Sequence, residues 1–173
     1  EDGAAGDPTE TALYAAASLA GAVREDIEAT WPRIAELPFD SERKLMTTFH
    51  RSPGGSITSL TKGAAEKIIA LSCDQYESDS IVAIECDELS ADVDEISSDG
   101  LRVLAYAIRE FDELPADLSI AEENMRFLGL VGLMDPPRPE AAVAVAQCIS
   151  AGIVPVMITG DHPSTAMAIA RQI

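Results

Sequence analysis

Basic residues are scarce in this sequence, and their scarcity excludes one class of partners. Its 173 residues include 12 Lys and Arg against 30 Asp and Glu, which gives a formal net charge of −18 at pH 7. Nucleic acids and anionic membrane surfaces are negatively charged, so most of this surface would repel them. We therefore expect no nucleic acid partner.

Paired cysteines and uninterrupted apolar runs are also lacking. The 3 cysteines lie far apart, without the spacing of a zinc site or a disulfide framework, and this favours a reducing cytosol. The longest apolar run, residues 141–158, contains Gly152 and Pro155, so it suits a helix, a turn and a strand better than a membrane span. We expect a soluble chain with a sizeable core.

The charge that is present is unevenly distributed. The segment Asp74 to Asp99 has ten acids and no Lys or Arg, and we interpret it as a solvated face. The segment from Phe39 to Lys67, by contrast, contains five basic residues and only three acidic ones. The five are Arg43, Lys44, Arg51, Lys62 and Lys67. This stretch is a local cationic region in an anionic molecule.

Local signals predict the elements of the first 120 residues. Asp7 as N-cap, Pro8 at the first helical position and Glu10 in a capping box predict a helix from residue 8. Residues 43–50 alternate as in a strand, and a Ser-Pro-Gly-Gly turn connects them to residues 56–62 as the second arm of a hairpin. Further helices are expected at residues 24–30, 64–71 and 91–97, and further strands at 80–86 and 101–108.

The pattern changes after Ala121. Residues 127–134 form an apolar run, residues 140–151 a helix and residues 153–158 a second apolar run, which together predict a β-α-β unit with parallel strands. We therefore expect an α/β fold with a boundary near residue 121: an α+β domain with a mostly antiparallel sheet flanked by helices, then a parallel segment over residues 122–173.

The turn after the last of these runs is a candidate for phosphate chemistry. Thr159, Gly160 and Asp161 follow the apolar run and precede a new helix. Ligands of open α/β sheets lie at the carboxyl ends of the strands, where the next helix also directs unpaired N–H groups. Periodicity alone fits equally an ordinary strand-turn-helix junction with Asp161 as the helix cap.

Five blocks of the sequence resemble P-type cation-transporting ATPases, in the order in which that family has them. They are Gly6-Asp7-Pro8-Thr9-Glu10, Pro38-Phe39-Asp40-Ser41-Glu42-Arg43-Lys44, Lys62-Gly63-Ala64-Ala65-Glu66, Gly100-Leu101-Arg102-Val103-Leu104, and Asp135-Pro136-Pro137-Arg138 with Thr159-Gly160-Asp161. The resemblance is greatest to the type II pumps for calcium or sodium. It implies that residues 1–121 are a nucleotide-binding domain whose first strands precede this chain, and that residues 122–173 begin a haloacid dehalogenase-like phosphorylation domain.

The resemblance assigns ATP-binding roles to residues of the cationic region. Phe39 would stack on adenine, which is worth roughly 1–3 kcal/mol for a base on an aromatic ring. Lys44, Lys62 and Arg102 would bind the polyphosphate. The alternatives remain open at this point: Phe39 as a core residue, and the three cations as exposed residues at strand ends that contribute little.

Other residues receive roles from the same resemblance. Glu10 would contact the adenine amino edge in addition to capping its helix, Gly63 would let the backbone approach the ligand, and Leu104 would pack under the nucleotide unless it is a core residue. In the last block, Thr159 and Asp161, with Gly160 between them, would lie near the transferred phosphoryl group and its metal. Asp135 would form a hinge, or the rigid start of a helix.

The sequence lacks the nucleophile of such an enzyme. Phosphoryl transfer needs a nucleophile and a magnesium ion held by carboxylates, yet the family's Asp-Lys-Thr-Gly-Thr and Gly-Asp-Gly-x-Asn-Asp motifs do not occur. We therefore expect an excised piece that binds ATP or ADP without turning it over, with no catalytic residue or metal site of its own and most Mg2+ ligands elsewhere. The parent would be an integral membrane ion pump with this domain in the cytoplasm. Its partners would be its own phosphorylation, actuator and transmembrane domains.

Two other functions remain possible from the sequence. A soluble haloacid dehalogenase-like phosphohydrolase needs an Asp-x-Asp pair at a strand end, and Asp92 and Asp94 have that spacing in a polar stretch. Phosphatase activity abolished by Asp92→Asn would indicate this enzyme. An interaction module could instead use the acidic face for a basic partner, and no nucleotide would then raise its melting temperature.

Overall fold

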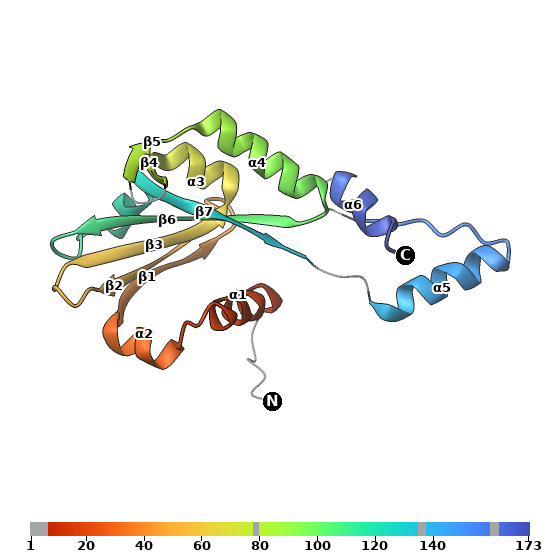
Figure 1. The fold of residues 1–173 in the computed structure, drawn as a ribbon, viewed down its shortest axis with the longest axis horizontal. Helices are drawn as coiled ribbons and strands as arrows, with labels where there is room; N and C mark the ends of the chain where they lie inside the picture. Colours follow the sequence, from red (N-terminus) through yellow and green to blue (C-terminus); the bar gives the residue numbers. More distant parts are fainter. Residues whose placement is uncertain (1–6, 78–79, 135–137, 160–162) are drawn as a thin grey trace. The chain divides into compact units, whose positions relative to one another are not determined.

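The structure, a computed structural model, describes residues 7–77, 80–134, 138–159 and 163–173. The chain divides into two compact units (Figure 1). The first contains Glu1–Cys86 and Leu104–Leu130, and the second contains Asp87–Val103 and Val131–Ile173.

A seven-stranded sheet in the order β1-β2-β3-β6-β7-β4-β5 forms the centre of the fold. The strands are β1 Arg33–Asp40, β2 Leu45–Arg51, β3 Ile57–Ala64, β4 Ser72–Glu77, β5 Ser80–Ala83, β6 Arg102–Phe111 and β7 Met125–Leu133. The registered pairs are antiparallel except for β4 with β7, which is parallel. The expected α+β domain with a mostly antiparallel sheet is therefore confirmed.

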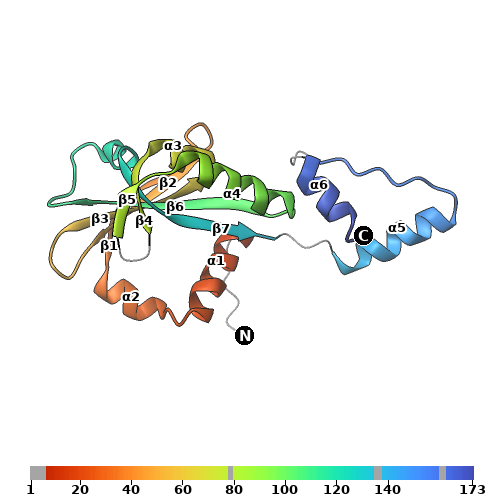
Figure 2. The same cartoon turned by 45° about the horizontal axis from the view of Figure 1, so that its top comes forward.

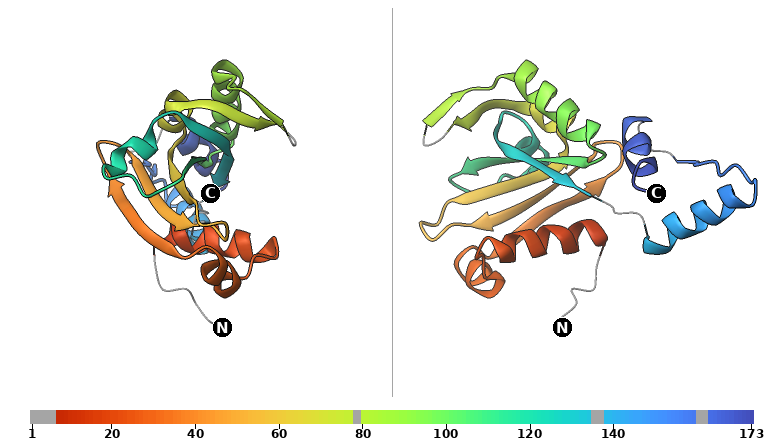
Figure 3. Two further views of the ribbon diagram at one scale, coloured as in Figure 1. Left: turned by 90° about the vertical axis from the view of Figure 1, so that its left-hand side faces the viewer. Right: turned by 45° about the vertical axis from the view of Figure 1, so that its right-hand side comes forward.

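Helices precede, interrupt and follow the sheet. They are α1 Pro8–Leu19, α2 Arg24–Thr30, α3 Ala65–Leu71, α4 Cys86–Ser98, the 3-10 helix η1 Leu118–Glu122, α5 Pro139–Ser150 and α6 Pro163–Ala170. Asp7 caps α1 as predicted, because its Oδ1 accepts a hydrogen bond of 2.9 Å from the Thr9 amide. Helices α1 and α2 lie on the side of the sheet where β1 and β2 are (Figure 3), and α3 lies beside the sheet (Figure 2).

The predicted hairpin forms, and its first strand, β2, begins at Leu45, two residues later than expected. The β2–β3 register pairs Thr47 with Thr61 and Met46 with Lys62. Since successive side chains of a strand point to opposite faces, Thr47 and Thr61 share one face and Met46 and Lys62 the other. The first face is the buried one: both threonines are at most 1% exposed.

The core lies on that buried face, where residues of η1 pack against the strands. Phe49, Ile57 and Ala121 are fully buried and form one cluster. Partly buried side chains pack around it, namely Ala35, Leu37, Phe111 and Leu118. Ile68 and Ile69 of α3 are also buried. Helices α1, α2 and α4, by contrast, contain no fully buried residue.

The β-α-β unit predicted after residue 121 is not confirmed, because its second strand does not form in the described residues. Residues 153–159 adopt neither helix nor strand. Val154, Val156 and Ile158 are 82%, 78% and 93% exposed. A strand needs a neighbour to satisfy its backbone hydrogen bonds, and no described strand pairs with this segment. The parallel partner of β7 is β4 instead.

Two strands and one helix differ from the sequence-based expectation. β1 and β4 were not predicted, and α4 begins at Cys86, five residues before the helix expected at residues 91–97. β7 joins the sheet of the first unit as far as Leu130. The boundary near residue 121 stays a prediction about functional domains.

The close approach of β3 to the β1–β2 turn yields a test of the fold. A Cβ built on Gly63 would lie 2.2 Å from the carbonyl oxygen of Lys44, whereas one on Gly54 would lie 3.7 Å from its nearest neighbour, Ser52 Oγ. We predict that Gly63→Ala lowers the free energy of unfolding in urea by about 2–3 kcal/mol, because backbone must shift. Gly54→Ala is the control and should change it by less than about 0.5 kcal/mol. Equal effects would mean that the approach is looser than described.

Candidate functional site

The turn between β1 and β2 sets the positions of Phe39 and Lys44. Asp40 Oδ1 accepts hydrogen bonds from the amides of Glu42 and Arg43, each 2.9 Å long. The Lys44 amide donates to the Asp40 carbonyl over 2.6 Å. The amide of Arg43, followed by that of Glu42, holds the pKa of the Asp40 carboxyl below its usual range. Asp40 therefore closes this turn in its ionised form.

Phe39 does not belong to the core. Its side chain is 63% exposed, whereas Phe49 on the next strand is fully buried. Of the two roles left open by the sequence, the structure therefore excludes packing in the interior. An exposed ring beside a charged turn is available to a planar ligand.

Two of the lysines in the cationic region contact carboxylates from other sequence blocks. Lys62 of β3 forms an ion pair with Glu10 of α1, 52 residues away. Lys44 Nζ lies 3.3 Å from Glu66 Oε1, and both of these side chains are exposed. The structure thus brings Glu10 to Lys62 and the β1–β2 turn to the start of α3.

The β3–β6 register adds two side chains to the Lys62 face. Lys62 pairs with Tyr106, and Ala64 pairs with Leu104. Leu104 and Tyr106 are two residues apart on β6, so both project from the same face as Lys62. Leu104 is half-buried.

Tyr106 is a site residue that the sequence reasoning missed. Burial raises the pKa of its phenol above the usual range, and the negative charge of Glu10 raises it further. The effect of Glu10 and the pairing with Lys62 together place the ring near the Glu10–Lys62 ion pair. The sequence offered one signal: Tyr106 lies two residues after Leu104, so in a strand both side chains project from the same face. Only the β3–β6 register, however, places Tyr106 opposite Lys62.

Gly63 and Arg102 have different surroundings from those expected. The close backbone approach at Gly63 is to the carbonyl of Lys44 and the side chain of Leu45. Packing within the protein therefore already requires glycine there. Arg102 is exposed and lies in the second unit, whereas Glu10, Lys44 and Lys62 lie in the first.

The last sequence block is described only in part. Thr159 is exposed. Gly160, Asp161 and Asp135 lie outside the described residues. Within the ranges that the structure describes, no group of three or more His, Cys, Asp or Glu is arranged to hold a metal ion. The described residues by themselves therefore do not form a Mg2+ site.

The Asp-x-Asp pair does not have the setting of a phosphohydrolase nucleophile. Asp92 and Asp94 both lie within α4 rather than at a strand end. Side chains two residues apart on a helix do not face each other. The phosphohydrolase alternative therefore loses the feature that suggested it.

Comparison with known proteins identifies the family. Residues 1–140 match the family model described as P-type ATPase, cytoplasmic domain N. The chain belongs to this family. The match covers the four sequence blocks that contain Glu10, Phe39, Lys62 and Leu104.

Several relatives align over nearly the whole chain. Calcium-transporting ATPase 1 of Bacillus cereus is 40% identical over 171 residues, which is 97% of this chain and 19% of the relative. The sodium/potassium exporting P-type ATPase cta3 of Schizosaccharomyces pombe is 38% identical over 174 residues, 97% of this chain and 16% of the relative. The cation-transporting ATPase pma1 of Synechocystis is 40% identical over 171 residues, 96% and 19% of the two chains.

The chain spans about a fifth of the length of these P-type ATPases. Their names differ in the ion they transport, although their identities to this chain are almost equal. In the described ranges, every helix is too short or too polar to span a bilayer. The match to domain N thus corresponds to one part of these longer proteins.

The placement of α1 over β3 can be tested through Tyr106. The raised pKa of its phenol favours the neutral form in the folded state, so this stabilisation is present below about pH 10 and is lost as the pH rises further. We predict that Glu10→Gln lowers the pKa of Tyr106 part of the way toward about 10, because burial remains. NMR titration of labelled tyrosine, assigned with Tyr106→Phe, measures the shift.

The matched control is Glu110→Gln, which removes an exposed carboxylate from the same strand. It should leave the midpoint of Tyr106 unchanged. An unchanged midpoint in Glu10→Gln as well would mean that α1 does not lie beside this ring in solution.

Proposed function

We propose that this chain binds ATP as the nucleotide-binding part of a cation-transporting P-type ATPase. The observation that supports it most is the convergence of separate sequence blocks in the first unit. Glu10 of α1 pairs with Lys62 of β3, and the Lys44 carbonyl in the turn after Phe39 accepts a backbone hydrogen bond from Ala64 of β3. A flat exposed ring and two primary amines are the groups that a purine with phosphates requires.

The ion pairs of the lysines are compatible with exchange for phosphate. Lys44 and Glu66 are both more than half exposed, and Glu10 is 56% exposed. Exposed pairs of this kind contribute about 0–1 kcal/mol, so a ligand with several negative charges can replace the carboxylates at small cost. Lys62 is less exposed, at 22%, and would bind phosphate more strongly because it is less screened by water.

The remaining proposals concern the larger protein. We propose that its nucleotide donates a phosphoryl group to an aspartate outside this chain, with Mg2+ held there, and that the aspartyl-phosphate drives cation transport across a membrane. Thr159, Gly160 and Asp161 would support that step, and Arg102 would bind the phosphates, as the family resemblance implies. The domain would then be cytoplasmic and would work with the phosphorylation, actuator and transmembrane domains of the same polypeptide. The chain alone would bind ATP or ADP without turnover.

Calorimetric titration with ATP and ADP tests nucleotide binding. We predict that Phe39→Ala weakens binding by about 1–3 kcal/mol through the loss of base stacking. Lys62→Ala should weaken it by more than tenfold, since it removes a cation and leaves Glu10 to repel phosphate. Chemical-shift changes on titration should include the amides of Phe39 and Lys62.

Arg51→Ala is the matched control. Arg51 is an exposed cation at the other end of β2 from Lys44, about 20 Å along the strand. Its loss should change the affinity by less than about twofold. The absence of heat and of shifts with wild-type protein, at concentrations that reveal weak binding, would refute the proposed function. Equal losses in Arg51→Ala and Lys62→Ala would indicate binding by net charge alone.

A further inference from the structure

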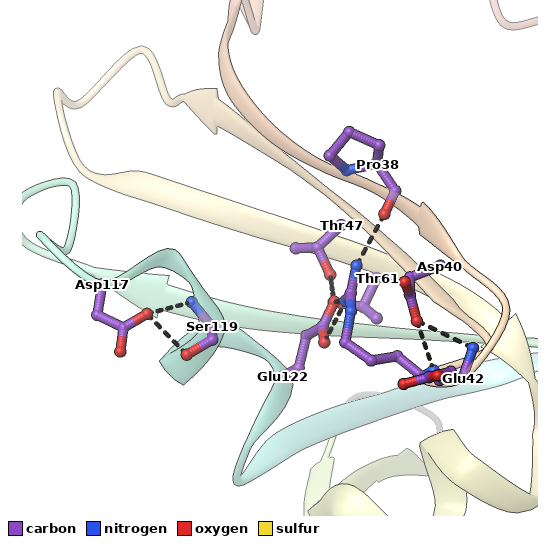
Figure 4. Close-up of polar contacts among 9 residues, drawn as sticks. Pro38, Asp40, Glu42, Thr47, Thr61, Asp117, Ser119 and Glu122 are labelled. Atoms are coloured by element: carbon purple, nitrogen blue, oxygen red, sulfur yellow. Dashed lines mark hydrogen bonds and ion pairs between the residues drawn. The ribbon is translucent and has the colours of Figure 1, made fainter.

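A buried carboxylate, to which the sequence analysis gave no role, lies beneath the β1–β2 turn. Glu122, the last residue of η1, is 6% exposed. The effective penalty for burying a charge without compensation is several kcal/mol, so its contacts must be close and numerous. Figure 4 shows the polar contacts around it.

Two side chains donate directly to the Glu122 carboxylate. Arg43 Nη1 donates to both oxygens, over 2.6 Å in the case of Oε2, and Thr47 Oγ1 donates to Oε1 over 2.9 Å. The Thr47 and Thr61 hydroxyls are 2.9 Å apart. Since Thr47 uses its proton on the carboxylate, Thr61 must be the donor to Thr47.

This network leaves no buried donor or acceptor unsatisfied. Among the residues that the structure describes, every buried side-chain nitrogen or oxygen has a hydrogen-bond partner. Thr47 and Thr61 belong to the buried face of β2 and β3. Such a satisfied buried network rigidifies the elements that it joins. Here it joins η1, β2, β3 and the turn before β2.

The other arm of the Arg43 guanidinium reaches the end of β1. Arg43 Nη2 donates to the carbonyl of Pro38 over 2.8 Å. The β1–β2 register is irregular between Leu37 and Asp40, so regular ladder pairing is interrupted at this point. Arg43 therefore ties the backbone just before Phe39 to a buried anion. Its fork geometry allows both contacts at once, which a lysine ammonium at the same position would not reproduce.

We propose that Glu122 is a positioning residue for nucleotide binding, an inference that rests on the proposed function. Glu122 acts through Arg43, which is adjacent to Lys44 and bonded to the residue before Phe39. It holds the segment Pro38 to Lys44 in one geometry before the ligand arrives. Affinity then benefits because little conformational freedom is lost on binding.

The experiment compares Glu122→Gln with Asp74→Asn. Asp74 is the matched control because it is a part-buried carboxylate in the same sheet, with bonds of 2.8 and 3.1 Å from Arg126. It lies on β4, far from β1 and β2 in the strand order. Each variant replaces one carboxylate by an amide of the same shape, so both should lower the urea midpoint.

Nucleotide affinity separates the two variants. Calorimetry with ADP, at a temperature where each protein is folded, should show about tenfold weaker binding in Glu122→Gln and a change below about twofold in Asp74→Asn. The amides of Glu42, Arg43 and Lys44 should exchange with solvent faster in Glu122→Gln only. This loss of protection confined to the turn would not follow from a general loss of stability.

Arg43→Lys keeps the inference testable if Glu122→Gln does not fold. It preserves a cation opposite Glu122 but removes the bond to the Pro38 carbonyl, so it should also weaken ADP binding and speed exchange in the turn. Wild-type affinity in whichever of these variants folds would overturn the positioning role and leave the proposed function intact. Equal weakening in Asp74→Asn would overturn it as well. Absence of binding by both wild type and Asp74→Asn would instead refute the proposed function itself, and the positioning role with it.

Discussion

The antiparallel register of β2, β3 and β6 is the constraint on which the candidate site depends. Lys62 lies between Met46 and Tyr106 in this register. A slip of one residue would turn Lys62 toward the core and expose Thr61, because the side-chain period of a strand is two. Gly63 opposes such a slip, since only a residue without a Cβ allows the Lys44 carbonyl to lie where it does. The packing of one glycine thereby determines which side chains share the face of the sheet that contains Lys62.

The proposed binding of phosphate by a chain of net charge −18 needs a local explanation. Lys62 and Lys44 each contact a carboxylate in the first unit, and the proposed nucleotide would replace these carboxylates with phosphate. The free domain thus avoids an uncompensated cluster of cations. Net charge governs long-range attraction, whereas affinity at short range depends on these individual pairs. The overall negative charge is therefore compatible with phosphate binding.

Signals from neighbouring residues in the sequence correctly predicted the elements that depend only on local interactions. The cap at Asp7 and the Ser-Pro-Gly-Gly turn between β2 and β3 depend on neighbouring residues, and both elements formed as expected. β4 depends on its partners β5 and β7 and was missed, because its own sequence is largely polar. Residues 153–158 were predicted as a strand from their apolar run, but they have no described strand partner. The residues of the candidate site also differ in whether the sequence could reveal them. Motif resemblance pointed to Phe39 and Lys62, but Tyr106 and Glu122 became visible only through contacts between distant segments.

The two carboxylates near the site differ in their exposure to water, and this difference separates their roles. Glu10 is 56% exposed on the Lys62 face, so water and salt can replace its contact with little loss. The Glu122 side chain is 8% exposed on the opposite face of the same strands, and breaking its contacts would leave a buried charge unpaired. The proposed nucleotide would therefore compete with Glu10 but not with Glu122. Under the proposed function, an exchangeable ion pair on one face of this sheet and a buried network on the other would allow the lysines to be released while the backbone that presents them stays fixed.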